Sequence, residues 1–146
     1  MKKIIAIANQ KGGVAKTTTT GALAAGLKQK GYKVLTIDLD PQGNLTDSVG
    51  ADGYNFPTTY ELMKREAKPE EAIQHLEAFD IIPANIMLAG AEQEFSQIGK
   101  EQRLKETIAP VVNQYDYIII DTPPALGVLT VNAFTVADEI IIPTTA

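Results

Sequence analysis

The chain has 146 residues, of which 45% are hydrophobic and 21% charged, as expected for one soluble globular domain with its own core. Its formal net charge of −5 gives no general attraction to nucleic acid, which argues against direct DNA binding by this segment. The absence of cysteine excludes disulfides, cysteine-bound zinc and iron–sulfur clusters, and a single histidine, His75, argues against a histidine metal site.

No targeting or membrane-spanning segment is predicted. The basic start is followed by an apolar run at residues 4–8 that is too short for the core of a signal peptide. No apolar run approaches the roughly 18 residues of a spanning helix. We therefore expect a cytoplasmic protein.

The segment NQKGGVAKTTT, residues 9–19, lies between a predicted strand at residues 3–8 and a predicted helix at residues 20–30. Strand, glycine-containing loop, Lys-Thr and helix is the layout of a phosphate-binding loop, in which backbone N–H groups surround phosphates. In such a loop Lys16 contacts the β- and γ-phosphates, and the hydroxyl of Thr17 is a ligand for Mg²⁺.

This loop departs from the pattern G-x-x-x-x-G-K-[ST], because Gln10 and Ala15 stand where its two glycines belong. The effect of Ala15 depends on its backbone angle φ. A negative φ tolerates the methyl group, whereas a positive φ costs about 1–2 kcal/mol and brings the Cβ atom against a phosphate. We expect tolerance, since the rest of the loop is intact.

Residues 32–38 predict a second strand, which Pro41 ends. Asp38 and Asp40 therefore follow at the carboxyl edge of an open α/β sheet, where ligands bind and where the first loop also lies. By itself the run from residue 38 to residue 44 is equally typical of a turn with Asx caps. Beside a phosphate loop, the functional interpretation is favoured.

Residues 45–99 predict short elements without an evident site. His75 is expected on a helix, as an ordinary surface or hydrogen-bonded histidine. The expected elements are a short helix capped by Asn44 with Asp47 and closed by Gly50, a helix opened by a Thr58/Glu61 capping box, a helix with Pro69 in its first turn, a strand at residues 79–83, and a surface helix at residues 88–98.

Residues 103–114 carry a helical apolar stripe, in which Pro110 is expected to kink the helix or end it early. Residues 115–121 then predict a buried parallel strand with Asp121 at its ligand-facing end. Any parallel strand can end in aspartate, but with a phosphate loop upstream this segment is interpreted as Walker B, with Asp121 holding Mg²⁺ through its water shell. A helix at residues 127–136 and a strand at residues 138–143 follow.

Strands alternate with helices throughout, so the expected fold class is α/β, as one domain over residues 1–146. We expect a doubly wound, mostly parallel sheet with helices on both faces.

Taken together, the three motifs resemble the ParA/MinD family of ATPases, whose deviant Walker A loop has an additional early lysine. That lysine is Lys11 here; Gln10 fits the family pattern, whereas Ala15 replaces its commoner glycine. The similarity runs over all 146 residues and is nearest to the ParA and Soj partitioning ATPases. It implies a P-loop NTPase fold, ATP and Mg²⁺ as cofactors, catalytic roles for Lys11, Lys16 and Asp40, a magnesium site at Thr17, Asp38 and Asp121, and a nucleotide loop made of Lys11, Gly12, Gly13, Val14, Ala15, Lys16, Thr17 and Thr18.

The same resemblance implies an ATP-dependent switch. Two subunits close face to face around ATP, Lys11 of each reaches the phosphates held by the other, and Asp40 orients the attacking water. The implied partners are a second copy, a ParB-like centromere-binding protein and non-specific DNA. Because family members are longer, this chain is expected to be an N-terminal part, with the DNA-binding surface in the missing C-terminal part. The full-length protein is expected on the nucleoid and not on a membrane.

Two other readings remain open. One is a MinD-like ATPase positioned on membranes, although the run from residue 38 to residue 44 favours ParA. The other is a folded nucleotide-binding fragment or scaffold without turnover, which Ala15 and the shortened sheet suggest. Weak or no turnover is expected of this chain on its own. The sequence does not distinguish a chromosome from a plasmid as cargo.

Overall fold

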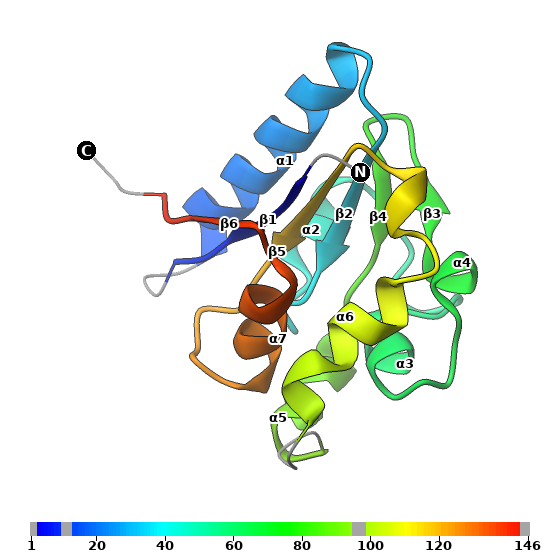
Figure 1. Ribbon diagram of the computed structural model, residues 1–146, viewed down its shortest axis with the longest axis vertical. Helices are drawn as coiled ribbons and strands as arrows, with labels where there is room; N and C mark the ends of the chain where they lie inside the picture. The colour runs from blue at the N-terminus through cyan, green and yellow to red at the C-terminus, as the bar shows by residue number, and fades with distance from the viewer. Residues whose placement is uncertain (1–2, 10–12, 95–98, 144–146) are drawn as a thin grey trace.

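The computed structural model describes residues 3–9, 13–94 and 99–143. Figure 1 shows the described elements along the chain. They are β1 (Lys3–Ile7), α1 (Gly13–Gln29), β2 (Val34–Asp38), α2 (Asn44–Ser48), α3 (Thr59–Met63), α4 (Pro69–Ala72), β3 (Gln74–His75), β4 (Asp80–Ile82), η1 (Ile86–Gly90), α5 (Ala91–Glu94), η2 (Lys100–Gln102), α6 (Arg103–Ile108), η3 (Val112–Gln114), β5 (Tyr117–Asp121), α7 (Val128–Val136) and β6 (Glu139–Ile141).

The described strands form one six-stranded sheet in the order β3-β4-β2-β5-β1-β6. Every pairing is parallel except that of β3 with β4. Chain neighbours β1 and β2 lie on opposite sides of β5, so the chain winds in both directions from the middle of the sheet. The expected doubly wound, mostly parallel fold is confirmed.

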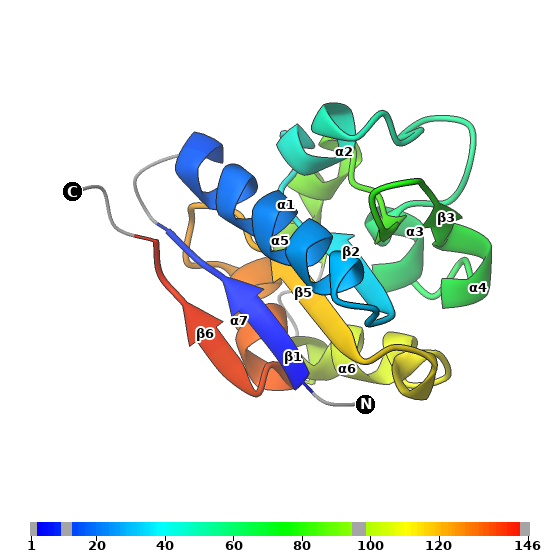
Figure 2. The ribbon, with the colours of Figure 1, turned by 90° about the horizontal axis from the view of Figure 1, so that it is seen from above.

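Helices cover both faces of the sheet, because the strands are apolar on both sides. In β1, Ile4 and Ala6 join the core beneath α3, α6 and α7, whereas Ile5 and Ile7 join the core beneath α1 and α2. Figure 2 shows these two helical layers on either side of the strands. The layers bury most of β1, β2, β4 and β5, whose carboxyl ends and connecting loops are left to form a site.

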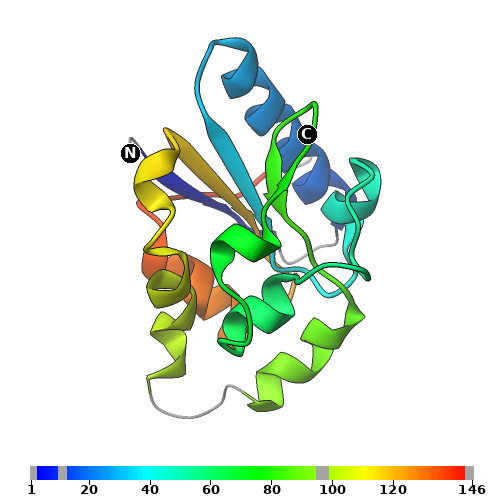
Figure 3. The ribbon, with the colours of Figure 1, turned by 90° about the vertical axis from the view of Figure 1, so that its right-hand side faces the viewer.

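The expectation that His75 lies on a helix is wrong. His75 belongs to β3, a two-residue strand that pairs antiparallel with β4 at the edge of the sheet (Figure 3). Two residues carry no periodic signal, so sequence pattern has no means of detecting this strand. Its Nδ1 atom lies 2.9 Å from Oδ2 of Asp80, and its side chain is 76% exposed. The expected hydrogen-bonded surface histidine is therefore confirmed.

The helices around residues 88–114 are shorter than predicted. The expected surface helix at residues 88–98 is divided into η1 and α5, and residues 95–98 lie outside the described part of the chain. Helix α6 ends at Ile108, and the N–H group of Val111 donates to the Ile108 carbonyl in the turn that follows. Pro110 has no N–H group to continue the helix, so the predicted early end is confirmed.

Within residues 3–9, 13–94 and 99–143, no helix combines the length and the apolar character that crossing a membrane requires.

Candidate functional site

The candidate site lies at the carboxyl edge of the sheet, where β1, β2 and β5 end side by side. Asp121 is in register with Ile7 of β1 and with Asp38 of β2. The pairing continues past the strands, since the N–H group of Leu39 donates to the Asp121 carbonyl over 2.9 Å. Parallel strands present their carboxyl ends at one edge, so this register brings the aspartates of the second and fifth strands together beside the start of α1.

Lys16 lies in the first turns of α1 with no exposed surface, and it contacts Asp121 and also Asp40, which lies two residues beyond the end of β2. Its Nζ atom is 2.8 Å from Oδ1 of Asp121 and 3.3 Å from Oδ2 of Asp40. A buried ammonium group is costly unless it is paired, and two carboxylates pair it here. Asp40 and Asp121, both expected at the edge of the sheet beside the phosphate loop, thus lie against Lys16.

Two threonines of α1 complete the surroundings of Asp121. The hydroxyl of Thr17 lies 3.1 Å from Oδ2 of Asp121, and that of Thr20 lies 3.4 Å from Oδ1. The Thr20 hydroxyl also donates to the Lys16 carbonyl over 3.0 Å. Sequence reasoning missed Thr20; its place one helical turn after Lys16 is the signal that could have revealed it.

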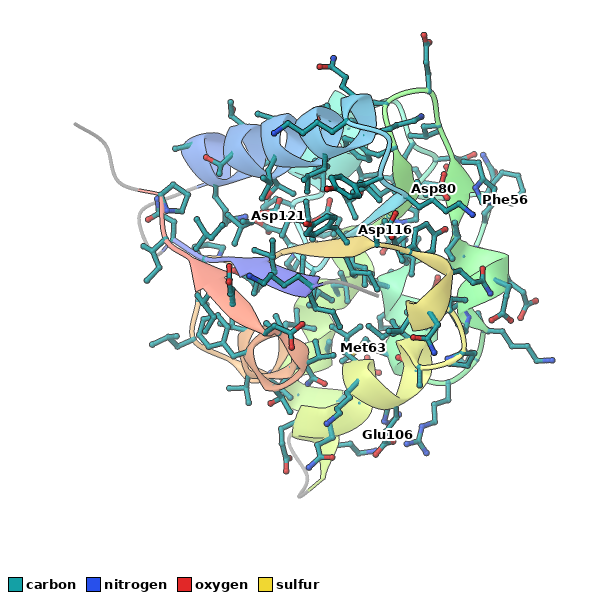
Figure 4. All side chains as sticks on the ribbon, turned by 45° about the horizontal axis from the view of Figure 1, so that its top comes forward. Phe56, Met63, Asp80, Glu106, Asp116 and Asp121 are labelled. Carbon is teal, nitrogen blue, oxygen red and sulfur yellow. The ribbon has the colours of Figure 1, made fainter. Side chains whose placement is uncertain are left out.

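The electrostatics of Asp121 reflect two opposing influences. Burial raises the pKa of its carboxyl, whereas the nearby Lys16 ammonium and the Thr17 hydroxyl act to lower it. In Figure 4 Asp121 lies near α1, and Asp80 and Asp116 lie toward the other end of the sheet. The acidic groups at the site are therefore distinct from those at the opposite edge.

Asp38 is fully buried, and both of its carboxylate oxygens accept hydrogen bonds. Oδ1 accepts from the Asp40 N–H group over 3.0 Å. Oδ2 accepts from the Thr46 N–H group over 3.0 Å and from the Thr46 hydroxyl over 2.8 Å. Burial, followed by repulsion from Asp121, raises the pKa of Asp38 to about 7, and the Thr46 and Asp40 hydrogen bonds act against that rise. Thr46 was not singled out by the sequence.

Asp40 begins a tight turn that aims its side chain at Lys16. Its Oδ1 atom accepts from the Gln42 N–H group over 3.0 Å, and its carbonyl accepts from Gly43 over 2.9 Å. Gly43 has a φ of 66°, which glycine adopts without the steric cost that a Cβ atom imposes. The Asx turn considered for this run is therefore present, and the same turn holds Asp40 at the site.

The N-terminal end of α1 supplies the other half of a phosphate site. The first N–H groups of a helix lack intrahelical partners, and this first turn contains no acidic residue. Ala15 lies within the helix, and Arg65 is the non-glycine residue with positive φ in the described part of the chain. Tolerance of the Ala15 methyl is thus confirmed for the backbone. Lys11 and Gly12 lie outside the described residues, so the role of Lys11 stays a prediction.

The donor set at this edge suits a hydrated divalent cation that is shared with phosphate. In the described residues no group of three or more His, Cys, Asp or Glu side chains forms a metal cage. Mg²⁺ typically keeps several waters and uses one or two carboxylates with substrate phosphates. The Thr17 hydroxyl and the Asp121 carboxylate fit that requirement. Asp38 and Asp121 both use their two carboxylate oxygens within the protein in this structure, and the predicted metal roles of Thr17, Asp38 and Asp121 stay predictions.

The chain is similar to known proteins over nearly all of its length. A family model described as "AAA domain" matches residues 2–146. The sporulation initiation inhibitor protein Soj of Bacillus subtilis is 48% identical over 98% of this chain and 58% of its own length. The chromosome partitioning protein ParA of Myxococcus xanthus is 43% identical over 97% of this chain and 51% of its own. The chain thus spans between half and three-fifths of these two relatives.

Solved structures agree with this similarity. The structure of a Mycobacterium smegmatis protein described as cobyrinic acid a,c-diamide synthase, with bound ATP analog and magnesium, superposes with a TM-score of 0.93. The two sequences are 43% identical over 99% of this chain and 59% of the other. Such agreement in backbone and sequence indicates a shared fold and a shared family.

Proposed function

The chain belongs to the ParA/MinD family of P-loop ATPases, and we propose that it binds ATP with Mg²⁺, dimerises in the ATP-bound state and hydrolyses ATP to ADP and phosphate. The observation that carries this proposal is the convergence of Asp40 and Asp121 on the buried Lys16 at the start of α1. Similarity to Soj and ParA supports chromosome or plasmid partitioning as the process that this switch serves.

Phosphate binding is assigned to Lys16 and the first turn of α1. The turn offers N–H donors to an anion. The phosphate oxygens of a triphosphate compete with the carboxylate oxygens of Asp40 and Asp121 for the ammonium group of Lys16. Once the Lys16 contact is exchanged for phosphate, Oδ2 of Asp40 is free to accept a hydrogen bond from water. Lys16 thereby links nucleotide binding to the availability of Asp40.

Magnesium, when bound, neutralises charge that develops on the phosphates. Thr17 would supply a hydroxyl ligand to the cation, and Asp121 would hold it through bound water. Asp38 remains a proposed member of the same site. Its hydrogen bonds to Asp40 and Thr46 give it a supporting position behind the other two.

Hydrolysis is assigned to Asp40 and Lys11. Asp40 orients the attacking water and accepts its proton, a role that requires a carboxylate next to the phosphates. Lys11 of each subunit reaches the phosphates bound by the other, so that turnover depends on dimerisation. A cation supplied by a partner is worth roughly 10³–10⁵ in rate in other P-loop enzymes.

The proposed partners are a second copy, a ParB-like centromere-binding protein and non-specific DNA. The net charge of −5 gives this segment no general attraction to DNA. The additional length of the relatives, which this chain does not cover, is the proposed place of DNA binding, and the nucleoid is the proposed location.

Calorimetric titration with Mg·ATP tests the proposal. The expected result is saturable binding that Lys16→Ala abolishes. Lys28→Ala is the matched control, because Lys28 lies at the far end of α1 and its Nζ atom donates to the Glu77 carbonyl. Absence of binding by the unaltered protein would contradict the proposal.

Two further measurements separate the alternatives. Pelleting of the protein with liposomes only in the presence of ATP favours a MinD-like positioning ATPase. Binding of ATP without hydrolysis, even with a ParB-like partner and DNA, favours a nucleotide-binding scaffold. Hydrolysis stimulated by the partner and DNA, without pelleting, supports partitioning.

A further inference from the structure

Thr46 forms hydrogen bonds that join three segments next to Asp38. It lies in α2 and is 2% exposed. Its hydroxyl donates to Oδ2 of Asp38 over 2.8 Å and accepts from the Ala84 N–H group, just beyond β4, over 2.9 Å. Its own N–H group donates to the same Asp38 oxygen over 3.0 Å. One side chain thus connects the end of β2, the first turn of α2 and the end of β4.

The direction of the Thr46 hydroxyl is determined by these partners. A hydroxyl has one proton to donate and accepts with its lone pairs. Because the Ala84 N–H group can only donate, the Thr46 oxygen accepts from it, and the single hydroxyl proton is directed to Asp38. In this orientation both Asp38 oxygens accept hydrogen bonds.

The orientation of Asp38 is transmitted to Asp40. With Oδ2 held by Thr46, Oδ1 faces the Asp40 N–H group and accepts from it over 3.0 Å. The side chain of the same Asp40 then lies 3.3 Å from Nζ of Lys16. The terminal torsion of an aspartate is broad. Removal of the Thr46 hydroxyl leaves Oδ2 with the Thr46 N–H group as its one donor from this residue, which loosens the carboxylate and, with it, the Asp40 N–H group.

We propose that Thr46 is a positioning residue for ATP hydrolysis, which acts through Asp38 to place Asp40 against the attacking water. This inference rests on the proposed function, because it assigns Asp40 to the hydrolytic step. Thr46 itself makes hydrogen bonds to Asp38 and Ala84 and not to Lys16 or Asp121, so nucleotide affinity is expected to change little when its hydroxyl is removed.

Three variants distinguish positioning from general stability. Thr46→Val keeps the shape of the side chain but removes the hydroxyl, and Thr46→Ser keeps the hydroxyl. Thr59→Val is the matched control: Thr59 is equally buried and joins the same strand ends, but it donates to the backbone carbonyls of Asp38 and Pro83 and not to the carboxylate.

The experiment measures kcat for ATP hydrolysis, the Kd of a non-hydrolysable ATP analogue and the thermal midpoint of each variant. Thr46→Val is expected to lower kcat by about 10- to 100-fold while the Kd changes by less than about threefold, since misplacement of a catalytic group by about an ångström costs rate and not binding. Thr46→Ser is expected to recover most of kcat, and Thr59→Val to keep it.

Hydrogen exchange at the Asp40 amide provides a readout that needs no catalysis. The Asp40 N–H group donates to Asp38, so its exchange is expected to accelerate in Thr46→Val relative to Thr59→Val.

Hydrolysis by the unaltered protein tests the proposed function separately. If the unaltered protein hydrolyses ATP and Thr46→Val is equally fast, the positioning role is wrong and the proposed function stands. Equal losses of kcat in Thr46→Val and Thr59→Val would also overturn the role.

Discussion

Oδ1 of Asp121 lies 2.8 Å from Nζ of Lys16, although the two residues are 105 positions apart in the chain. Both side chains are without exposed surface. The contact joins the end of β5 to the first turns of α1, so it couples the sheet to the helix that begins the phosphate site. Removal of either partner leaves the other charge buried.

Asp121→Asn is expected to destabilise the protein by about 3 kcal/mol, because breaking a buried ion pair leaves an incompletely compensated charge on Lys16. Urea denaturation of the nucleotide-free protein gives the measurement. Glu139→Gln is the control, since its ion pair with Lys3 is half exposed and is screened by solvent. Equal midpoints for the two variants would show that the buried pair contributes nothing specific.

Stability is expected to fall as pH rises from about 4 to 7, because of Asp38. Its pKa is about 7 in the folded protein, against an ordinary value of 3.8. The folded state therefore binds the proton of Asp38 more tightly than the unfolded state does. The resulting contribution to the free energy of unfolding is fully present below pH 3.8 and is lost as pH rises through 7. The contribution is at most about 4 kcal/mol, at 1.36 kcal/mol for each unit of pKa shift.

Thermal midpoints from pH 4 to pH 8 in the absence of Mg²⁺ measure this dependence. The slope is expected to flatten in Asp38→Asn. It is expected to persist in Asp52→Asn, because hydrogen bonds from Tyr54 and Asn55 lower the pKa of Asp52 below its ordinary value and it titrates outside the window. An unchanged slope in Asp38→Asn contradicts the assignment.

Asp40→Ala is expected to lower kcat for ATP hydrolysis by about 10²–10⁴, the range that a general base contributes. Binding of Mg·ATP is expected to persist, because Lys16 and the first turn of α1 remain. Asp47→Asn is the control: Asp47 lies on α2 in the same segment but is exposed. Full activity of Asp40→Ala would show that Asp40 is not the general base.

Ala15→Gly is expected to leave ATP affinity within a few-fold of the unaltered protein, because Ala15 already lies in helical backbone. The substitution is expected to destabilise the fold by about 0.5–1 kcal/mol, as glycine does within helices. Calorimetry and urea denaturation give the two values, with Ala25→Gly in the same helix as the control. A gain of orders of magnitude in affinity would show that the alanine impairs the loop.

The sequence alone was sufficient to predict the architecture and the place in the fold of the main candidate site residues. The run from strand 3–8 through Lys16 and Thr17 into a helix is local, and its glycines, lysine and apolar residues carry the prediction without any distant partner. Asp38 and Asp121 were predictable for a related reason: parallel strands that end in acids place them at one edge of the sheet.

The tertiary structure decided which of these groups touch and what holds them. Thr20 reaches Asp121 over a separation of 101 residues, and Thr46 reaches Ala84 over 38. Such contacts depend on strand register and on how α1 and α2 pack against the sheet, and no local sequence pattern encodes either. His75 entered a two-residue strand because pairing with Asp80 was available at the edge of the sheet. Hydrogen bonds between residues far apart in the chain require that the packing of the core bring the two groups within reach.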